Sequence, residues 1–355
     1  LSGGLRQRVM IGMAMVCKPK VMIADEPTTA LDVTIEAQIL RLMKRLRDEQ
    51  GTSIILITHN MGVVAEVCDY VYVMYAGMVM EQAEVFDLFE NTSHPYTQGL
   101  LKSIPKLDSR EERLYTIEGV VPNLLRLPEG CNFCNRCGKA EARCLKEKPG
   151  LYGIGADGNG MSHKVRCFLY EGMGMTPAPW NQADRTHRQH HRMGRWQKMA
   201  GKKILLEARD LVKEFALEGG KKGKNVVHAV SGVNLRIYEG ETLALVGESG
   251  CGKSTLGRTL IKLIEATSGT IEFDGTDITR MKDREFTEIR RQMQIIFQDP
   301  YASLNPRMNV REIISEPLTT HGLARTKDEI ESQVKALMDE VGIPREFINR
   351  YPHQF

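Results

Sequence analysis

The stretch Gly247–Thr255, GESGCGKST, constrains the fold of this chain more than any other feature. It matches the pattern G-x-x-x-x-G-K-[S/T], whose glycines let the backbone curl so that successive N–H groups point at phosphate oxygens. A continuous apolar run, Thr242–Gly247, precedes it, and a segment with helical spacing, Lys253–Ile264, follows it. A strand, a glycine-rich loop and a helix N-terminus in this order predict a phosphate-binding site in an α/β fold.

Each part of this loop has an expected role. The ammonium group of Lys253 is expected to reach the β- and γ-phosphates, and the hydroxyl group of Ser254 is expected to bind Mg²⁺. A glycine turn without a ligand is the alternative, and the flanking strand and helix argue against it. The predicted nucleotide-contacting residues are Gly247, Glu248, Ser249, Gly250, Cys251, Gly252, Lys253, Ser254 and Thr255.

A second apolar run ends in two carboxylates, in the sequence VMIADEP at Val21–Pro27. Ligands of open α/β sheets bind at the carboxyl ends of the strands, so these acids are candidates for the same site. Asp25 is predicted to hold Mg²⁺ through water, and Glu26 to orient or deprotonate the attacking water. The alternative is a pair of solvated acids at a strand end.

Two further polar residues follow apolar runs in the same way. His59 comes directly after Ser53–Thr58, and Gln298 comes directly after Met293–Phe297. We expect His59 to hydrogen-bond the γ-phosphate and the water, and Gln298 to contact Mg²⁺ and water. A surface histidine without a ligand is the alternative for His59.

The segment Leu1–Gly4, LSGG, leads into a helical pattern. The Ser2 hydroxyl and the amides of Gly3 and Gly4 would together form an anion-binding helix N-terminus for a γ-phosphate. Taken alone, the pattern fits an ordinary capped helix equally well.

Pattern and composition divide the 355 residues into four regions. Apolar strands alternate with helical spacing in 1–100 and again in 204–355, as in buried parallel sheets. Residues 101–170 are rich in proline, glycine and cysteine and fit a small metal-stapled extension. Residues 171–203 are predicted to be a linker. Helices are expected at Val33–Glu49, Val310–His321 and Lys327–Val341, and Gly77 is expected to divide Tyr70–Met80 into two strands.

Charge and hydropathy exclude several classes of protein. A formal charge of +3 on a chain of this length does not indicate a nucleic-acid-binding protein. No stretch approaches 18 uninterrupted apolar residues, so a membrane span is not expected. With no secretion signal at Leu1, we expect a cytosolic location, in which clustered cysteines favour a metal site over disulfides.

The cysteines that cluster are Cys131, Cys137, Cys144 and Cys167, with Cys134 as an extra residue in the first gap. Thiolates at such spacings suit zinc or an iron–sulfur cluster, and Cys134 is a possible substitute ligand. A cluster of thiols without metal is the alternative. The expected role of the site is structural.

Together these motifs resemble the ATP-binding cassette (ABC) family of P-loop ATPases. The signature loop matches Leu1–Gly4, Walker A matches Gly247–Thr255, and Walker B with its catalytic glutamate matches Val21–Glu26. The D-loop matches Ala30–Asp32, the switch histidine is His59, and the Q-loop glutamine is Gln298. The resemblance implies a mixed sheet with helices on both faces, a helical subdomain, and catalytic roles for Glu26, His59, Lys253 and Gln298 with ATP and Mg²⁺.

Further segments resemble the dipeptide and oligopeptide importers in particular: Ile295–Met308, Ala24–Thr34 and HPYT at His94–Thr97. That resemblance implies a 4Fe–4S cluster on Cys131, Cys137, Cys144 and Cys167, with Zn²⁺ as the alternative. It also implies permease subunits, a second ATPase module, a solute-binding protein outside the membrane, and a peripheral place on the cytoplasmic face of the inner membrane. Nickel or another small solute is the alternative cargo. A soluble ATPase of DNA repair is a further alternative, which lacks support because no heptad arms are present.

Some positions depart from the family pattern. Leu5 stands where many cassettes have glutamine, and Asn60 stands where an acid often follows the switch histidine. Phe215 is the candidate to stack on adenine, with a core phenylalanine as the alternative.

The order of the motifs is that of the back half of one ATPase followed by the front half of a second. The last residues, YPHQF, would run naturally into a segment such as the first one, LSGG. Either the halves belong to two different modules, or they dock on each other as a circularly permuted cassette. We favour the second arrangement because it buries the strand edges of both halves. It predicts that Lys253 lies close to Asp25.

Overall fold

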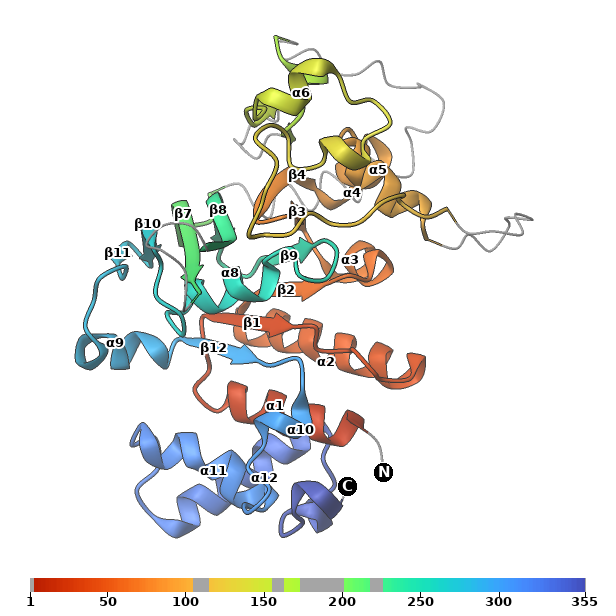
Figure 1. The fold of residues 1–355 in the computed structure, drawn as a ribbon. Helices are drawn as coiled ribbons and strands as arrows, with labels where there is room; N and C mark the ends of the chain where they lie inside the picture. Colours follow the sequence, from red (N-terminus) through yellow and green to blue (C-terminus); the bar gives the residue numbers. More distant parts are fainter. Residues whose placement is uncertain (1–2, 105–114, 155–162, 173–200, 218–225, 355) are drawn as a thin grey trace. The chain divides into compact units, whose positions relative to one another are not determined.

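The computed structural model describes residues 3–104, 115–154, 163–172, 201–217 and 226–354. The chain forms two compact units, and the first of them combines segments from both ends of the sequence (Figure 1). The first unit contains 1–57, 239–241 and 280–355, and the second contains 58–238 and 242–279. Of the predicted linker 171–203, residues 173–200 lie outside the described residues, as do Leu1 and Ser2.

The first unit contains a parallel sheet in which β1 lies between β12 and β2. Val21 is in register with Met293 on one side and with Ser53 on the other. Every residue of β1 and β2 is buried, which explains their continuous apolar runs. The strands are β1 (Val21–Asp25), β2 (Ser53–Thr58) and β12 (Met293–Ile296).

Helices from both ends of the chain pack together in the first unit. Helix α1 lies beside α11 and α12 (Figure 1). Arg6 Nε donates to the carbonyl oxygen of Pro352 over 2.9 Å, and Arg8 Nη1 donates to that of Val341 over 2.6 Å. The last described residues thus contact the first helix. The helices are α1 (Gly3–Met15), α2 (Val33–Gln50), α9 (Asp283–Arg290), α10 (Pro300–Ser303), α11 (Val310–Thr320) and α12 (Lys327–Val341).

The second unit contains a mixed sheet that again joins the two halves. Strand β3 pairs in parallel with β9 and antiparallel with β4, and β6 and β5 extend the sheet beyond β4. The strands are β3 (Tyr70–Tyr75), β4 (Met78–Glu84), β5 (Tyr152–Gly153), β6 (Lys164–Val165) and β9 (Thr242–Val246). The helices of this unit are α3 (Met61–Val67), α4 (Val85–Glu90), α5 (Pro95–Lys102), α6 (Ala142–Lys146) and α8 (Lys253–Leu260).

A separate antiparallel sheet in the second unit was not predicted. Its strands are β7 (Ile204–Ala216), β8 (Val226–Tyr238), β10 (Ser268–Phe273) and β11 (Thr276–Asp277). Strands β7 and β8 pair along their length, but the register shifts four times, so the alternation of apolar and polar residues is interrupted. Asp210 and Gly232 have positive φ values of 47° and 62° within these strands. These irregularities hide the period of two that identifies a strand from sequence.

The other predicted elements are close to those observed. Strands β1 and β2 have the predicted bounds, and Ala76 and Gly77, both with positive φ, make the turn between β3 and β4. Helix α8 ends at Leu260 rather than Ile264, because Lys262 has a left-handed φ of 54° that a helix cannot continue through.

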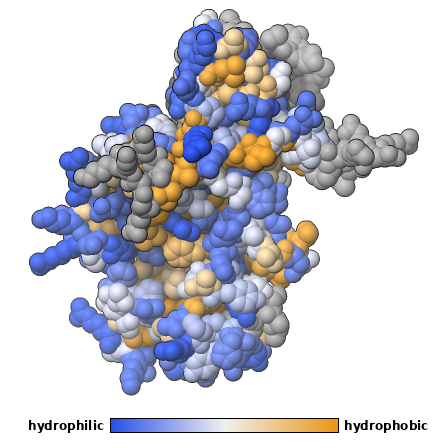
Figure 2. All heavy atoms as spheres, viewed as in Figure 1, coloured by the Kyte–Doolittle hydropathy of each residue, from blue (hydrophilic) through white to orange (hydrophobic). Residues whose placement is uncertain are grey.

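On the face drawn in Figure 2, hydrophilic residues predominate and the hydrophobic ones form separate patches. Among the described residues, none of the helices combines the length and hydropathy that crossing a bilayer requires.

Candidate functional site

Close backbone packing in the second unit shapes the loop Gly247–Thr255. A Cβ atom on Gly247 would lie 2.2 Å from the carbonyl oxygen of Met74, and one on Gly252 would lie 2.1 Å from that of Ala229. Both glycines have positive φ, at 150° and 104°. Only glycine combines this backbone conformation with so close an approach, so the loop is held against β3 and β8.

The loop surrounds its own lysine. Lys253 begins α8, and its Nζ donates to the carbonyl oxygens of Gly247 over 2.8 Å and Glu248 over 3.0 Å. The residue is only 5% exposed. The ammonium group therefore lies inside the curl, at the N-terminus of a helix, where phosphate oxygens are favoured.

The second residue of the loop has partners that the sequence did not reveal. The backbone N–H of Glu248 donates to the hydroxyl of Tyr96 over 2.9 Å. Its carboxylate accepts two hydrogen bonds from Arg136, at 2.7 Å and 3.2 Å. Tyr96 belongs to the HPYT segment and Arg136 to the cysteine-rich region. No local pattern indicates a contact between residues so distant in sequence.

In the first unit, the acidic end of β1 meets the predicted Q-loop glutamine. Asp25, the last residue of β1, is fully buried. Glu26 has a positive φ of 48°, and its Oε2 accepts hydrogen bonds from Gln298 Nε2 at 3.1 Å and Thr29 Oγ1 at 2.9 Å. The structure thus brings Glu26 and Gln298 together, although 272 residues separate them.

The polar residues near these motifs also begin helices. Asp32, at the end of the predicted D-loop, accepts a hydrogen bond from Ile35 N and caps α2. Asn60 accepts hydrogen bonds from Gly62 N and Val63 N and caps α3, which explains an asparagine after His59. His59 itself is exposed.

The other residues predicted to contact nucleotide are Phe215, Ser2, Gly3 and Gly4. Phe215 lies near the end of β7, is 37% exposed, and has Lys213 Nζ at 4.7 Å from its ring centroid, so it is not a core residue. Gly3 and Gly4 begin α1, and a Cβ on Gly4 would lie 2.5 Å from Cγ2 of Ile35. Ser2 is outside the described residues.

The predicted site residues are divided between the two units. Asp25, Glu26 and Gln298 lie in the first unit, whereas His59 and the loop Gly247–Thr255 lie in the second. The closeness of Lys253 to Asp25 therefore stays a prediction.

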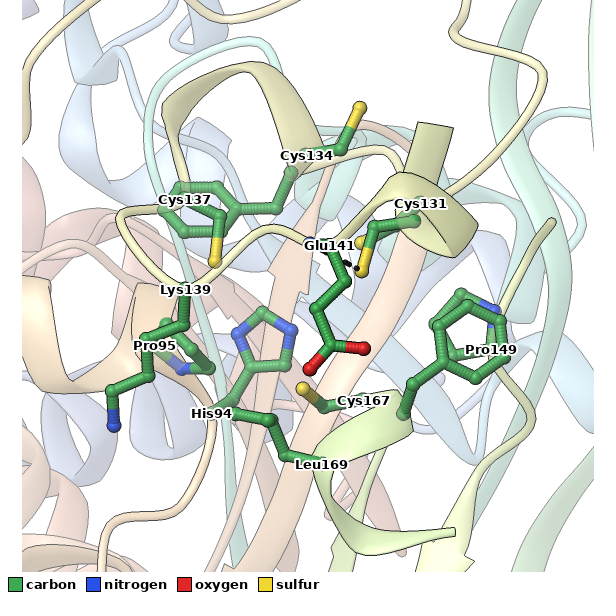
Figure 3. Close-up of a pocket in the computed structure, with 13 residues that line it drawn as sticks. His94, Pro95, Cys131, Cys134, Cys137, Lys139, Glu141, Pro149, Cys167 and Leu169 are labelled. Atoms are coloured by element: carbon green, nitrogen blue, oxygen red, sulfur yellow. Dashed lines mark hydrogen bonds between the residues drawn. The ribbon is translucent and has the colours of Figure 1, made fainter. Parts of the chain in front are cut away.

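A second candidate site lies at the cysteine-rich region. All five of its cysteines line one pocket, together with His94 and Glu141. The thiols of Cys131, Cys137 and Cys167 point toward the space beside His94, and that of Cys134 points away from it (Figure 3). Burial raises the pKa of Cys131 to about 11 and also raises the pKa values of Cys137 and Cys167, so these thiols carry protons at neutral pH.

The arrangement of these donors does not meet the iron–sulfur prediction. Thiols are the donor type that iron–sulfur clusters and zinc require. Yet within the described parts of the chain, no three His, Cys, Asp or Glu residues are grouped closely enough to hold a metal ion. The 4Fe–4S prediction is therefore not supported by the positions of the side chains.

A buried ionic group links His163 of the cysteine-rich region to β4 and α4. His163 donates or accepts hydrogen bonds at both ring nitrogens, with Glu81 at 2.7 Å and Asp87 at 2.9 Å. Burial alone would lower the pKa of His163, but the two carboxylates outweigh it and raise the pKa to about 9. Glu81 also accepts hydrogen bonds from the backbone N–H groups of Ser93 and His94. Burial lowers the pKa of His94 to about 4.

Comparisons with known proteins agree with these features. The ABC transporter family matches residues 1–29 and 230–355, and the oligopeptide/dipeptide transporter C-terminal region matches residues 80–144. The oligopeptide transport ATP-binding protein OppD of Mycobacterium tuberculosis is 40% identical over 359 residues, covering 100% of this chain and 56% of that protein. The glutathione import ATP-binding protein GsiA of Pectobacterium atrosepticum is 39% identical over 357 residues, covering 100% and 48%.

The chain spans about half the length of the curated relatives it matches. Among solved structures, a dimeric ATP-binding cassette in a post-hydrolysis state with ADP and phosphate is 26% identical, with a TM-score of 0.39. That match covers 42% of this chain and 63% of the other. By these matches, residues 1–29 and 230–355 are similar to ABC transporters, and residues 80–144 are similar to the C-terminal region of the oligopeptide/dipeptide transporters.

Proposed function

We propose that the chain binds and hydrolyses ATP as part of an ABC importer for peptides. The observation that carries this proposal is the loop Gly247–Thr255, closed around the ammonium group of Lys253 at a helix N-terminus. A buried cation at a helix N-terminus, in a loop whose Gly247 and Gly252 leave no room for side chains, favours a polyphosphate over other ligands. The pairing of Glu26 with Gln298 supports hydrolysis in addition to binding.

The hydrolytic roles follow from the residue types. Glu26 would orient the attacking water, and His59 would hydrogen-bond the γ-phosphate. Gln298 would contact Mg²⁺ and the water. Mg²⁺ would neutralise charge on the β- and γ-phosphates. Oxygen donors fit this ion, and the buried carboxylate of Asp25, the hydroxyl of Ser254 and the amide of Gln298 are the residues that would hold it. Ser2, Gly3 and Gly4 would contact ATP held by a second module, and Phe215 would stack on adenine.

The cargo is proposed from the relatives and the C-terminal region. OppD is named for oligopeptide transport and GsiA for import of the tripeptide glutathione, and the matched C-terminal region is that of oligopeptide/dipeptide transporters. Membrane permease subunits, a second ATPase module and a solute-binding protein would complete the transporter. The chain would lie on the cytoplasmic face of the membrane. Nickel or another small solute is the alternative cargo.

We further propose that the halves form a circularly permuted cassette. In support, β1 pairs with β12 in the first unit, and β3 pairs with β9 in the second. Each pair joins a strand of region 1–100 to one of region 204–355. The hydrogen bond from Arg6 to Pro352 also joins the two ends of the chain.

A metal site on Cys131, Cys137, Cys144 and Cys167 is a secondary proposal, as a 4Fe–4S cluster or zinc. The shared pocket supports it, whereas the absence of a three-donor group among the described residues counts against it. Metal analysis of anaerobically purified protein tests it. Replacing Cys137 and Cys167 by serine should remove bound iron or zinc, and metal-free wild-type protein would contradict the proposal.

Substitution of Glu26 tests the hydrolytic mechanism. Glu26→Gln should bind Mg-ATP as wild type does while ATP turnover falls by about a hundredfold or more, because the amide cannot act as a base. Glu49→Gln, at an exposed position on α2, is the matched control and should retain wild-type turnover. Unchanged turnover in Glu26→Gln would remove Glu26 from the mechanism.

A further inference from the structure

The cysteine-rich region packs directly onto the elements that support the nucleotide loop. The ring of Phe133 lies 5.3 Å from that of Tyr75 and 5.4 Å from that of Tyr96, centroid to centroid. Asn132 Nδ2 donates to the carbonyl oxygen of Ala76 in the β3–β4 turn over 2.9 Å. The next residue of that turn, Gly77, donates its N–H to the carbonyl oxygen of Cys251 in the loop. All of these residues belong to the second unit.

The side chain of Arg136, in the cysteine-rich region, reaches Glu248 of the loop. Arg136 ends the short helix Cys134–Arg136, and its side chain is only 6% exposed. Nε donates to the carbonyl oxygen of Glu118 over 2.9 Å. The two terminal nitrogens share the hydroxyl of Tyr75, the carbonyl oxygen of Ile117 and both carboxylate oxygens of Glu248. A guanidinium group has five N–H donors, and here each has an acceptor, so the geometry of the side chain is fixed.

Glu248 is held at three points, and each affects the phosphate site. Arg136 holds its carboxylate, the Tyr96 hydroxyl accepts its N–H, and its carbonyl oxygen accepts a hydrogen bond from Lys253 Nζ. The residue thus connects Arg136 to the lysine that faces the nucleotide. Its side chain remains 25% exposed. A carboxylate in an anion-binding loop repels phosphate unless a nearby cation balances it.

We propose that Arg136 is a positioning residue of the nucleotide site, which fixes and neutralises Glu248 so that the phosphate-binding loop can accept a polyphosphate. The cysteine-rich region then sets the affinity of the loop for nucleotide through one ion pair. This inference rests on the proposed nucleotide-binding function. It assigns to Arg136, with Tyr96, the role of positioning Glu248. Neither residue belongs to the ATPase motifs or to the cysteine cluster.

The test is calorimetric titration of the 355-residue chain with Mg-ADP, which binds without turnover. Arg136→Ala should weaken ADP binding about tenfold, because the loop loses the hydrogen bonds that fix Glu248 and the Glu248 carboxylate is left without its cation. Arg136→Ala with Glu248→Gln should recover most of the lost affinity, a rescue that a general loss of packing would not produce.

Arg143→Ala is the matched control. Arg143 lies in the same region and also pairs with carboxylates, Glu147 and Glu171, but none of its contacts reaches the loop. The ADP affinity of Arg143→Ala should equal that of wild type. Thermal unfolding of each variant shows whether it is folded. If Arg136→Ala does not fold, Arg136→Lys is tested in its place. Arg136→Lys keeps the charge but loses the bidentate contact with Glu248, so it should bind ADP more weakly than wild type. Adding Glu248→Gln to Arg136→Lys should recover the affinity.

The outcomes separate the two proposals. If wild-type protein does not bind Mg-ADP, the proposed function fails, and this inference fails with it. If wild type binds and the folded Arg136 variant binds equally well, the inference alone is overturned. Weakened binding without rescue by Glu248→Gln would also overturn it, because the loss would then come from packing.

Discussion

The glycines of the phosphate-binding loop and the acidic end of β1 are held in different ways. The loop Gly247–Thr255 is shaped by backbone contacts against neighbouring strands, and its lysine is held by carbonyl oxygens of the loop itself. Glu26, at the end of β1, is instead held by side chains, one of which comes from a segment 272 residues away. The comparison teaches that the glycines of the first site tolerate almost no added side chain, whereas the carboxylate of Glu26 at the second site is positioned by hydrogen bonds from other side chains.

Substitution of Gly252 should give the largest effect and would test the first half of this comparison. Gly252→Ala should destabilise the protein by about 3 kcal/mol and abolish nucleotide binding, because its Cβ would overlap the carbonyl oxygen of Ala229. Chemical denaturation and ADP titration measure the two effects. Gly275→Ala is the control, since Gly275 also has a positive φ but no atom within 4 Å of the added Cβ. It should cost about 1 kcal/mol and leave ADP binding unchanged.

Two buried histidines of the second unit should make the stability of the protein depend on pH in opposite senses. Because the pKa of His163 is raised to about 9, its stabilising contribution is complete below pH 6.5 and is lost as the pH rises to about 9. At its maximum the contribution is roughly 3 kcal/mol. His94 acts in the opposite sense, because burial lowers its pKa to about 4. Above pH 6.5 His94 is neutral in both states and costs no stability. As the pH falls toward 4, the unfolded chain gains a proton that the folded chain does not, so the free energy of unfolding falls.

Denaturation of wild type and His163→Asn across this range measures the effect. The difference in unfolding free energy between the two should be largest near pH 6 and should vanish above pH 9. A difference that stays constant with pH would mean that the Glu81–His163–Asp87 group is not ionic in the folded state.

The smallest effects concern the residue after the switch histidine. Asn60→Ala should lower the unfolding free energy by about 1 kcal/mol, because α3 loses its N-cap. Asn60→Asp keeps the cap and should match wild type in stability and in ATP turnover. Higher turnover in Asn60→Asp would show that this position contributes to catalysis as well as to the helix.

The sequence predicted the parts of the fold that local chemistry determines. Strands β1 and β2 and the loop around Lys253 follow from apolar runs and from glycines that have no room for a side chain. Gln298 was predicted from its place after the apolar run Met293–Phe297, and in the structure it donates a hydrogen bond to Glu26.

Other features depend on long-range contacts or on irregular backbone, and the sequence did not reveal them. The antiparallel sheet was missed because bulges in β7 and β8 break the alternating pattern. The pair Arg136–Glu248 joins residues that are 112 positions apart in the sequence, and no local spacing indicates this contact. The cysteine spacing predicted a metal site; the five cysteines line one pocket, but among the described residues no three donors are grouped closely enough to hold a metal ion.

Titration of wild type and Lys253→Ala with Mg-ATP tests the central claim most directly, with Lys327→Ala, at an exposed position, as the control. We predict that wild type and Lys327→Ala bind alike and that Lys253→Ala binds about a hundredfold more weakly, because two charge-assisted contacts to phosphate are lost. Equal affinity in Lys253→Ala, or no binding by wild type, would contradict the account.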